Sequence, residues 1–272
     1  MALQSAIINV MQKAAEMAGR KLARDFGEVE HLQVSRKGPA DFVSAADTKA
    51  EKIIFQELSK ARPDFGFLLE ENGSVEGKDP NSRWIVDPLD GTTNFLHGIP
   101  HFAISIALEQ NGEVTAGLIY QPLTDEIFWA EKGRGAYLNN RRLRVSARKN
   151  MADSLLATGI PFKGREGHVE FIAALETIMP EVSGVRRFGS AALDLAWVAA
   201  GRYDGFWETN LQYWDVAAGI LMVSEASGTV TTFNGKKDKL DGKEILATNG
   251  ALHGPVTRLL ATARKKVRTT ED

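Results

Sequence analysis

Two aspartates that flank a proline and a leucine are the side chains of this sequence best suited to chemistry. Asp87 ends the apolar run that begins at Trp84, and Asp90 follows three residues later, directly ahead of Gly-Thr-Thr. Pro88 lacks the N–H that a central strand needs, so we expect the chain to turn there and to bring both carboxylates to one turn. Carboxylates bind hard cations, and a glycine with hydroxyl residues at a helix start can hold an anion. The segment therefore predicts metal-assisted chemistry on a phosphate.

Four further acids could complete such a site: Asp47, Glu70, Glu71 and Asp215. Each also has an ordinary structural explanation. Asp47 stands three residues after Ser44, ahead of a helical pattern, and this spacing of a capping box favours capping on local grounds. The two adjacent glutamates follow a short apolar run, where acids are usually solvated. Asp215 falls in the first turn of a predicted helix, where a carboxylate complements the helix dipole.

The pair Asp87 and Asp90 differs from these acids because the aromatic and apolar residues that precede it predict burial. Buried carboxylates that lie close together repel each other, so they become protonated or destabilise the fold unless cations lie between them. A metal site is therefore the preferred interpretation of this motif over a simple turn.

The elements that must position these residues begin with helices and continue with strands. An amphipathic helix is predicted over residues 3–23 and a second helix over about 45–58. The middle of the sequence predicts strands at 84–87, 102–108, 114–120 and 126–130. The turn signals Asn111-Gly112 and Pro122–Asp125 separate the last three strands, which predicts antiparallel hairpins.

The second half of the sequence alternates strands with helices. Strands are predicted at 155–158, 204–207, 229–233 and 245–248, and helices at 168–179, 191–200, 214–226 and about 252–263. We therefore predict a mixed α+β and α/β fold, with an N-terminal α+β lobe over residues 1–145 and a C-terminal α/β lobe over 146–272 in one compact unit. The charged tail 264–272 has little apolar surface to bury, so we expect it to fray.

Composition limits the classes of protein to consider. The 272 residues include no cysteine, which excludes disulfides and cysteine-ligated metals. The net charge of −2 gives no indication of a basic surface, so we expect no direct nucleic-acid binding. The first residues lack the features of a signal peptide and the longest apolar runs are too short to cross a bilayer, so we expect a cytoplasmic protein with no membrane partner.

Two motifs carry a family resemblance. The segment Trp84-Ile-Val-Asp-Pro-Leu-Asp-Gly-Thr-Thr-Asn-Phe95 resembles the metal-binding motif of the inositol monophosphatase family, and Trp214-Asp215-Val-Ala-Ala-Gly219 resembles its second motif. The spacing of the acids at 47, 70 and 71 ahead of the first motif also agrees. The resemblance covers about residues 37–228 and implies a layered αβαβα sandwich, as in sugar phosphatases, and a magnesium-dependent, lithium-sensitive phosphatase.

The resemblance also implies which residues bind metal. Glu70, Asp87 and the backbone carbonyl of Leu89 would hold one magnesium ion. Asp87, Asp90 and Asp215 would hold a second, with Asp87 bridging the two, and Glu70 would touch a third and weaker ion.

The same resemblance implies the residues that bind and activate the reactants. Thr92, paired with Asp47, would orient the attacking water and help to deprotonate it, and Glu70 belongs to this catalytic set. Gly91 and Thr92 would offer N–H groups to the phosphate, and Glu208 would contact substrate hydroxyls. The implied substrate-binding set is Asp90, Gly91, Thr92, Gly189, Ser190, Ala191, Glu208 and Asp215.

We therefore expect a phosphomonoesterase with two or three Mg²⁺ ions per site that hydrolyses myo-inositol 1-phosphate or a related inositol monophosphate, and a homodimer by resemblance. The continuation Thr93-Asn94-Phe95 resembles the inositol branch of the family. Two alternatives stay open. One is another substrate of the superfamily, namely fructose 1,6-bisphosphate, histidinol phosphate, NADP or adenosine 3',5'-bisphosphate. The other is a binding partner of the transcription machinery, as some bacterial relatives are.

Overall fold

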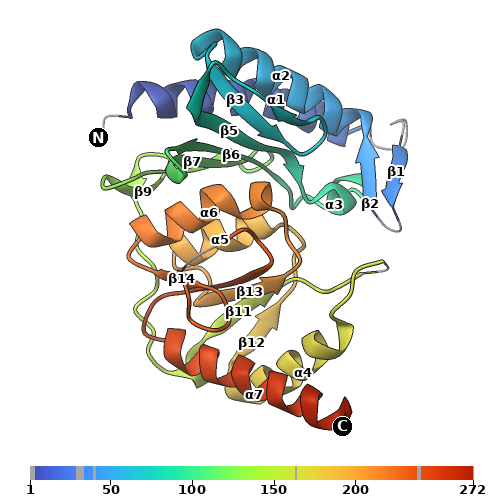
Figure 1. Cartoon of the computed structure of the whole chain (residues 1–272), viewed down its shortest axis with the longest axis vertical. Coiled ribbons are helices and arrows are strands. Elements are labelled where there is room, and N and C mark those ends of the chain that lie inside the picture. The colour runs from blue at the N-terminus through green and yellow to red at the C-terminus, as the bar shows by residue number, and fades with distance from the viewer. Residues whose placement is uncertain (1–3, 29–33, 39–40, 163, 238–239, 272) are drawn as a thin grey trace.

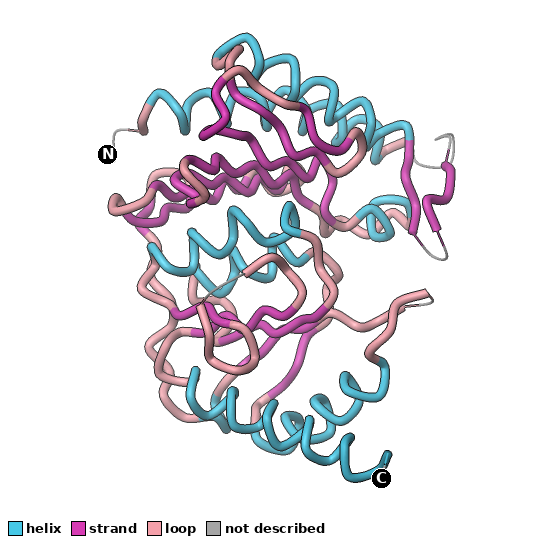
Figure 2. Tube along the Cα trace, in the orientation of Figure 1, coloured by secondary structure: helices cyan, strands magenta, loops and turns pink. Residues whose placement is uncertain are grey.

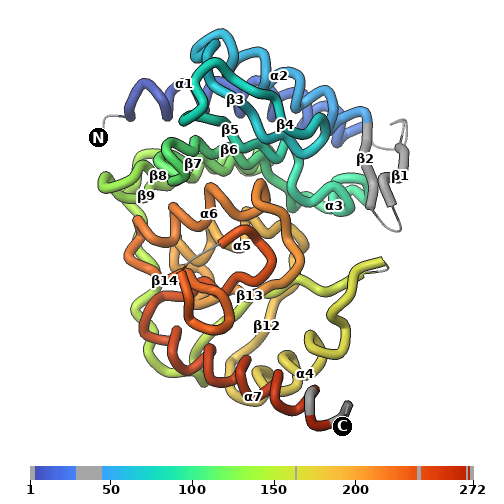
Figure 3. Tube along the Cα trace, in the orientation of Figure 1, coloured from blue at the N-terminus to red at the C-terminus, as the bar shows by residue number. Residues whose placement is uncertain are grey.

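Helices and sheets alternate in layers through the molecule. The computed structural model describes residues 4–28, 34–38, 41–162, 164–237 and 240–271. Helices α1 (Ala6–Phe26) and α2 (Ala45–Ala61) form the top layer in Figure 1, above the larger sheet. Below it the cyan helix layers and magenta strand layers of Figure 2 continue in alternation. The first half of the chain, blue to green in Figure 3, forms the upper layers, and the second half forms the lower ones. The predicted mixed αβαβα fold is confirmed.

The larger sheet has eight strands in the order β10-β9-β8-β7-β6-β5-β3-β4. Their bounds are β3 Phe65–Leu69, β4 Gly73–Val75, β5 Asp79–Asp90, β6 Ala103–Gln110, β7 Glu113–Gln121, β8 Glu126–Glu131, β9 Gly135–Leu138 and β10 Arg141–Arg142. All neighbours pair antiparallel except β3 and β5. The predicted hairpins are confirmed, and Asn111 and Gly112 join β6 to β7 with φ angles of 53° and 78°, which suit a two-residue hairpin turn. A separate hairpin consists of β1 (Val34–Gly38) and β2 (Asp41–Ser44).

The second sheet has five strands in the order β12-β11-β13-β15-β14. Their bounds are β11 Leu155–Thr158, β12 Gly184–Arg186, β13 Gly205–Thr209, β14 Thr229–Thr231 and β15 Glu244–Thr248. Helices α5 (Ala191–Ala199) and α6 (Tyr213–Glu225) lie between the two sheets, and α4 (His168–Ile178) and α7 (His253–Glu271) cover the outer face. The short 3-10 helix η2 (Met151–Asp153) precedes β11, and a second one, η3 (Met179–Glu181), follows α4.

Small residues let the central helices pack closely against their neighbours. A Cβ atom on Gly117 of β7 would lie 3.0 Å from the Cα of Ala218 in α6, and a Cβ on Gly219 would lie 2.5 Å from the Cβ of Leu195 in α5. A larger side chain at Gly117 would push α6 away from the larger sheet, and one at Gly219 would push α5 and α6 apart, so these glycines keep the central helices close to their neighbours.

The prediction that the chain turns at Pro88 is wrong. Strand β5 continues to Asp90, and the proline lies in a register irregularity between the pairs Asp87↔Ser105 and Asp90↔Ala103. Two residues of β5 therefore face one residue of β6, which is a β-bulge and accommodates a residue that cannot donate to the ladder. Both carboxylates still lie at this end of β5, as the motif predicted.

The prediction that the tail frays at residue 264 is also wrong. Helix α7 continues to Glu271, because its apolar stripe of Val256, Leu260 and Ala263 extends to Val267, which is 7 % exposed. Arg264 pairs with Glu244 of β15 and fixes the helix to the second sheet. Within the described part of the chain, no helix has both the length and the apolar character needed to span a bilayer. The lobe boundary at residues 145 and 146 stays a prediction.

Candidate active site

The first motif lies where β5 passes into the short helix α3 (Thr92–Leu96). Ile85, which lies on the same face of β5 as Asp87, is buried in the core, and only 2 % of Asp87 is exposed. The backbone N–H of Leu89 donates to Asp87 Oδ1 at 2.9 Å across the bulge. Gly91 adopts φ 100°, and a Cβ there would lie 3.1 Å from the carbonyl oxygen of His101, so the turn into α3 requires glycine.

Thr92 and Asp47 meet although 45 residues separate them in the sequence. Thr92 Oγ1 lies 3.0 Å from Asp47 Oδ1 and 3.0 Å from the carbonyl oxygen of Leu89. Asp47 is fully buried in the first turn of α2, and the proposed cap by Ser44 lies outside the described side chains. A hydroxyl that donates to a buried carboxylate can pass on a proton taken from a water molecule.

Asp90 joins the two halves of the molecule. Its Oδ2 accepts hydrogen bonds from Ser190 Oγ at 2.6 Å and from the backbone N–H of Ala192 at 2.7 Å. These two residues belong to the segment that opens α5, where Ser190 is also the N-cap. The structure thus brings the predicted segment 189–191 directly onto the first motif.

Asp215 lies in the first turn of α6, as predicted. Its Oδ2 accepts a hydrogen bond from the backbone N–H of Gln212 at 2.8 Å, and the two residues form a reciprocal capping box. The helix therefore holds this carboxylate in a fixed place at its N-terminal end, where the helix dipole stabilises negative charge.

The carboxylates at the ends of β5 and α6 influence one another strongly. Burial raises the pKa of Asp87 well above its usual value, and the negative charges of Glu70, Asp90 and Asp215 raise it further. The pKa of Asp215 is raised by burial and then by the charge of Asp90. Burial also raises the pKa of Asp90 to about 6, against the hydrogen bonds that it accepts. A set of buried acids that disfavour each other's charge is an environment that a cation would stabilise.

The donor atoms fit hard divalent cations by their chemistry. They are carboxylate oxygens with a backbone carbonyl nearby, and neither histidine nor cysteine contributes. As the side chains stand, no group of three or more His, Asp or Glu among the described residues is already arranged to hold an ion. One oxygen of each of Asp87, Asp90 and Asp215 accepts a hydrogen bond from a protein donor. The acids of the predicted metal site therefore lie together in one cluster, and their binding of a metal ion stays a proposal.

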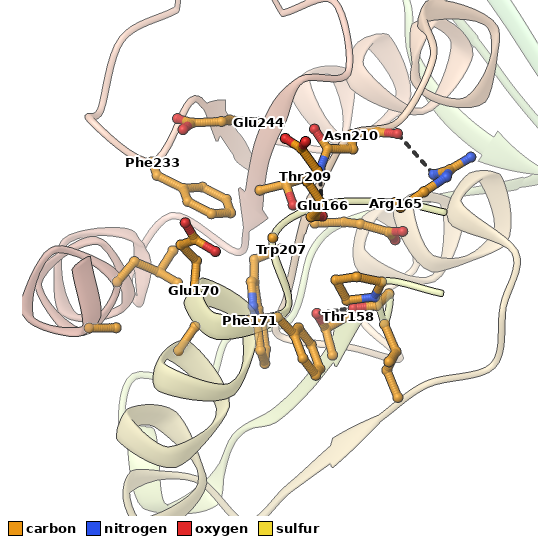
Figure 4. Close-up of a pocket in the computed structure, with 18 of the residues that line it drawn as sticks. Thr158, Arg165, Glu166, Glu170, Phe171, Trp207, Thr209, Asn210, Phe233 and Glu244 are labelled. Carbon is orange, nitrogen blue, oxygen red and sulfur yellow. Dashed lines mark hydrogen bonds between the residues drawn. The ribbon is translucent and has the colours of Figure 1, made fainter. Parts of the chain in front are cut away.

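Glu208 lies at the end of β13, on the side of this cluster that faces the second sheet. Burial raises the pKa of its carboxyl to about 8, and the charge of Asp90 raises it as well. A Cβ on Gly159 would fall 1.9 Å from Glu208 Oε1, so the absence of a side chain at Gly159 is what leaves room for the carboxyl. Both residues also line a cavity of about 550 Å³, shown in Figure 4.

Two residues that sequence reasoning missed hold this site together. Asn94 is 6 % exposed, and its Nδ2 lies within hydrogen-bond distance of the carbonyl oxygens of His101 at 2.8 Å and Phe188 at 2.7 Å. Glu51 is 1 % exposed and accepts the backbone N–H of Glu71 at 2.9 Å, which fixes the chain beside Glu70. The position of Asn94 within the motif was the available signal for the first, and the i+4 spacing of Glu51 from Asp47 on α2 was the signal for the second.

Known proteins are similar to this one over nearly the whole chain. The sequence matches the inositol monophosphatase family over residues 3–268. It is 58 % identical over 263 residues to an inositol-1-monophosphatase of Mesorhizobium japonicum, covering 97 % of each chain. It is 42 % identical over 243 residues to the Nus factor SuhB of Vibrio cholerae, covering 89 % of this chain and 91 % of that one. The crystal structure of the extragenic suppressor protein SuhB from Bartonella henselae superposes with a TM-score of 0.92 at 60 % identity, covering 94 % of this chain and 98 % of that one. The chain therefore belongs to the inositol monophosphatase family.

Proposed function

We propose that this protein is a magnesium-dependent phosphomonoesterase that converts myo-inositol 1-phosphate, or a closely related inositol monophosphate, to inositol and inorganic phosphate. The observation that carries the proposal is the acidic cluster of buried Asp87 and half-buried Asp90 and Asp215, beside the hydrogen bond between Thr92 and Asp47. The family is one of phosphatases, and the relative from Mesorhizobium japonicum is named inositol-1-monophosphatase.

The acidic cluster would hold two or three magnesium ions. Glu70, Asp87 and the carbonyl of Leu89 would hold one, and Asp87, Asp90 and Asp215 would hold another. When bound, the cations supply the positive charge that attracts a phosphate dianion to an acidic site, that activates water and that stabilises the charge developing on the leaving oxygen.

The residues of the chain perform the remaining tasks. Thr92 orients the attacking water and passes its proton toward Asp47, which is buried and cannot move away. Gly91 and Thr92 present backbone N–H groups to the phosphate. Glu208, with the segment 189–191, contacts the hydroxyls of the departing alcohol.

A panel of phosphate monoesters with and without magnesium tests this proposal. We expect phosphate release from myo-inositol 1-phosphate to exceed release from fructose 1,6-bisphosphate, histidinol phosphate, NADP and adenosine 3',5'-bisphosphate, and to stop with a chelator. Faster release from one of the other compounds would assign the site to that substrate. Release unaffected by chelation would refute the magnesium site.

Family resemblance also supports inhibition by lithium and a homodimer for this phosphatase, and its cytoplasmic location stays a prediction from the sequence. A second candidate function, binding to the transcription machinery, is favoured by the likeness to a Nus factor. Capture of RNA polymerase by this chain, equal for wild type and for Asp90→Asn, would support that role. Capture of no polymerase by either protein would exclude it.

A further inference from the structure

Glu70 begins the tip of an exposed hairpin. Strands β3 and β4 are joined by residues 70–72, and Leu69 pairs with Gly73 across this tip. Strand β4 lies at the edge of the larger sheet, and each of its residues is exposed. A hairpin with few buried contacts opens locally more easily than the centre of a sheet. A metal ligand at its tip therefore needs support from another element.

The base of the hairpin places Glu70 beside Asp87. Leu69 pairs with Val86 in the parallel ladder, and both are buried in the core that α1 and α2 cover. Because side chains alternate along a strand, Asp87 faces the other side of the sheet. The backbone N–H of Glu70 donates to the carbonyl oxygen of Val86 at 3.2 Å, and the charge of Glu70 raises the pKa of Asp87. The first residue of the tip is thus fixed to β5.

A buried acid of α2 holds the other residues of the tip, which lies below that helix in Figure 3. Glu51 Oε2 accepts the backbone N–H of Glu71 at 2.9 Å, and Glu51 Oε1 accepts a hydrogen bond from Asn72 Nδ2. Glu51 is 1 % exposed, and no Lys or Arg of the described ranges pairs with it. Burial of such a carboxyl costs free energy that its hydrogen bonds must offset. Its contacts with the tip, and not an ion pair, therefore account for an acid at this position.

Helix α2 also positions a second group of the candidate site. Asp47 lies one turn before Glu51, and residues four apart lie on the same side of a helix. Thr92 Oγ1 donates to Asp47 as described above. One helix therefore fixes the tip of the hairpin and the hydroxyl of Thr92 relative to each other. Because both oxygens of Glu51 are engaged by the tip, this acid acts through the loop and not as a metal ligand.

We propose that Glu51 is a positioning residue for Glu70: by holding the tip of the hairpin against α2, it sets the affinity of the acidic cluster for the cation that Glu70 and Asp87 would share. The inference rests on the proposed function, which places a magnesium ion there. Removing a residue that orients a metal ligand typically lowers metal affinity by about 10–100-fold. Glu51 thus acts on the magnesium requirement and has little effect once the ion is bound.

Two substitutions of Glu51 test the role of its acceptor oxygens. Glu51→Ala removes both. Glu51→Gln keeps one for the N–H of Glu71, and its amide can donate to the side-chain oxygen of Asn72 after that amide rotates. We expect the magnesium concentration for half-maximal phosphate release to rise by about tenfold or more in Glu51→Ala and to stay near the wild-type value in Glu51→Gln. The kcat at saturating magnesium should change little in either variant.

The matched control for the stability of α2 is Ile54→Val, which shortens a fully buried side chain of the same helix. It should lower the Tm and leave the magnesium requirement unchanged. A requirement that rises as much in Ile54→Val as in Glu51→Ala would assign the effect to helix stability and overturn the proposal. A wild-type requirement in Glu51→Ala would overturn it too, as would equal impairment of the alanine and glutamine variants.

Two measurements need no turnover. In the metal-free protein, the amide of Glu71 should exchange with deuterium more slowly in the wild type than in Glu51→Ala. Isothermal titration calorimetry should show the same loss of magnesium affinity as the kinetic assay. Equal exchange rates would refute the anchor even in a fully active enzyme. A wild-type protein that binds magnesium but releases no phosphate would refute the proposed function, and a calorimetric loss in Glu51→Ala would still support the role of Glu51.

A double-mutant cycle examines the same contact without Glu51→Ala. Asn72→Asp, in the exposed tip, places a second carboxylate against Glu51 and should speed the exchange of the Glu71 amide. In the double variant Glu51→Gln with Asn72→Asp, the amide and the carboxylate have changed places and the net charge equals that of the wild type. Slow exchange should then return. A double variant that exchanges as fast as Asn72→Asp alone would refute the proposal.

Discussion

The carboxyl of Asp90 has a structural and a chemical task, which a conservative substitution can separate. Its Oδ2 receives two hydrogen bonds from the start of α5, and its charge belongs to the acidic cluster. Asp90→Asn keeps the volume and one accepting oxygen but removes the charge. We expect phosphate release to fall by about 10²-fold or more in a protein that still folds.

The matched control for this experiment is Asp64→Asn, which changes an aspartate that is 58 % exposed and lies 3.7 Å from Lys78 on the surface. This variant should retain wild-type activity. Activity retained by Asp90→Asn would contradict the assigned role of the carboxyl.

The hydroxyl of Thr92 has two acceptors for one proton, Asp47 and the carbonyl of Leu89. Thr92→Val preserves the branched shape and removes only the hydroxyl. We predict a fall in kcat of about 10²–10⁴-fold, the usual range for a lost proton-transfer partner. Thr92→Ser restores the oxygen and should recover most of the rate in the same phosphate-release assay. Equal rates for the valine and serine variants would show that the hydroxyl does not take part.

The sequence pointed to the acids of the candidate site but not to the residues that hold the site together. Asp87, Asp90 and Asp215 were predicted from their types and from the order of two motifs. Asn94 was missed because its partners are backbone carbonyls, one of them 94 residues away, and its place in the motif did not identify these partners. Glu51 was missed for the same reason, since it accepts the backbone N–H of Glu71, which lies outside α2.

At the scale of single elements, helices and strands were predicted well where apolar periodicity was strong, as in α1, β6 and α6. Both errors occurred where a tertiary contact overrides a local rule. Pro88 should end a strand, but a bulge opposite β6 accommodates it. The charged end of α7 should fray, but Val267 extends its buried stripe to the second sheet.

Helix α3 and the segment that opens α5 are coupled by the side chain of Asn94. It lies within hydrogen-bond distance of the carbonyl oxygens of His101 and Phe188, so it ties α3 to the segment that leads into α5. Asn94→Ala removes this donor from both carbonyl oxygens. We expect a loss of about 1–3 kcal/mol in the free energy of unfolding and a higher KM, measured by denaturant titration and phosphate release.

Asn140→Ala supplies the control for this tether, since it removes the same side chain from an exposed turn. It should change neither quantity. An Asn94→Ala protein with wild-type stability and KM would show that the other contacts between the two segments suffice.

At the scale of the whole molecule, the acidic cluster lies where three layers meet: the end of the larger sheet, the start of α6 and the end of β13 in the second sheet. Helices α5 and α6 are shared by both sheets, and their small residues set the distance between them. The site is therefore assembled only in the complete fold, and what binds there stabilises all of these layers together.

The stability of the metal-free protein should therefore depend on pH in a defined direction. Asp90 has a pKa of about 6 and Glu208 one of about 8 in the folded chain, both above the ordinary values near 4 of the unfolded chain. Such groups bind more protons when the protein is folded. They contribute no difference below about pH 4, and the fold loses stability as the pH rises from there toward about 8. With a chelator present, we expect a lower Tm near the upper end of this range than near its lower end.

Magnesium should reverse much of that loss, because it binds the charged carboxylates of the folded cluster and competes with protons. At about pH 8, millimolar magnesium should raise the Tm by ~5 °C, while the increase near pH 5 should be much smaller. Differential scanning calorimetry measures both, with sodium chloride of equal ionic strength as the control for screening. The increase should shrink in Asp90→Asn and persist in Asp64→Asn. A Tm at about pH 8 that is the same with chelator and with magnesium would mean that the cluster holds no ion, and the charge of these acids would then need another explanation.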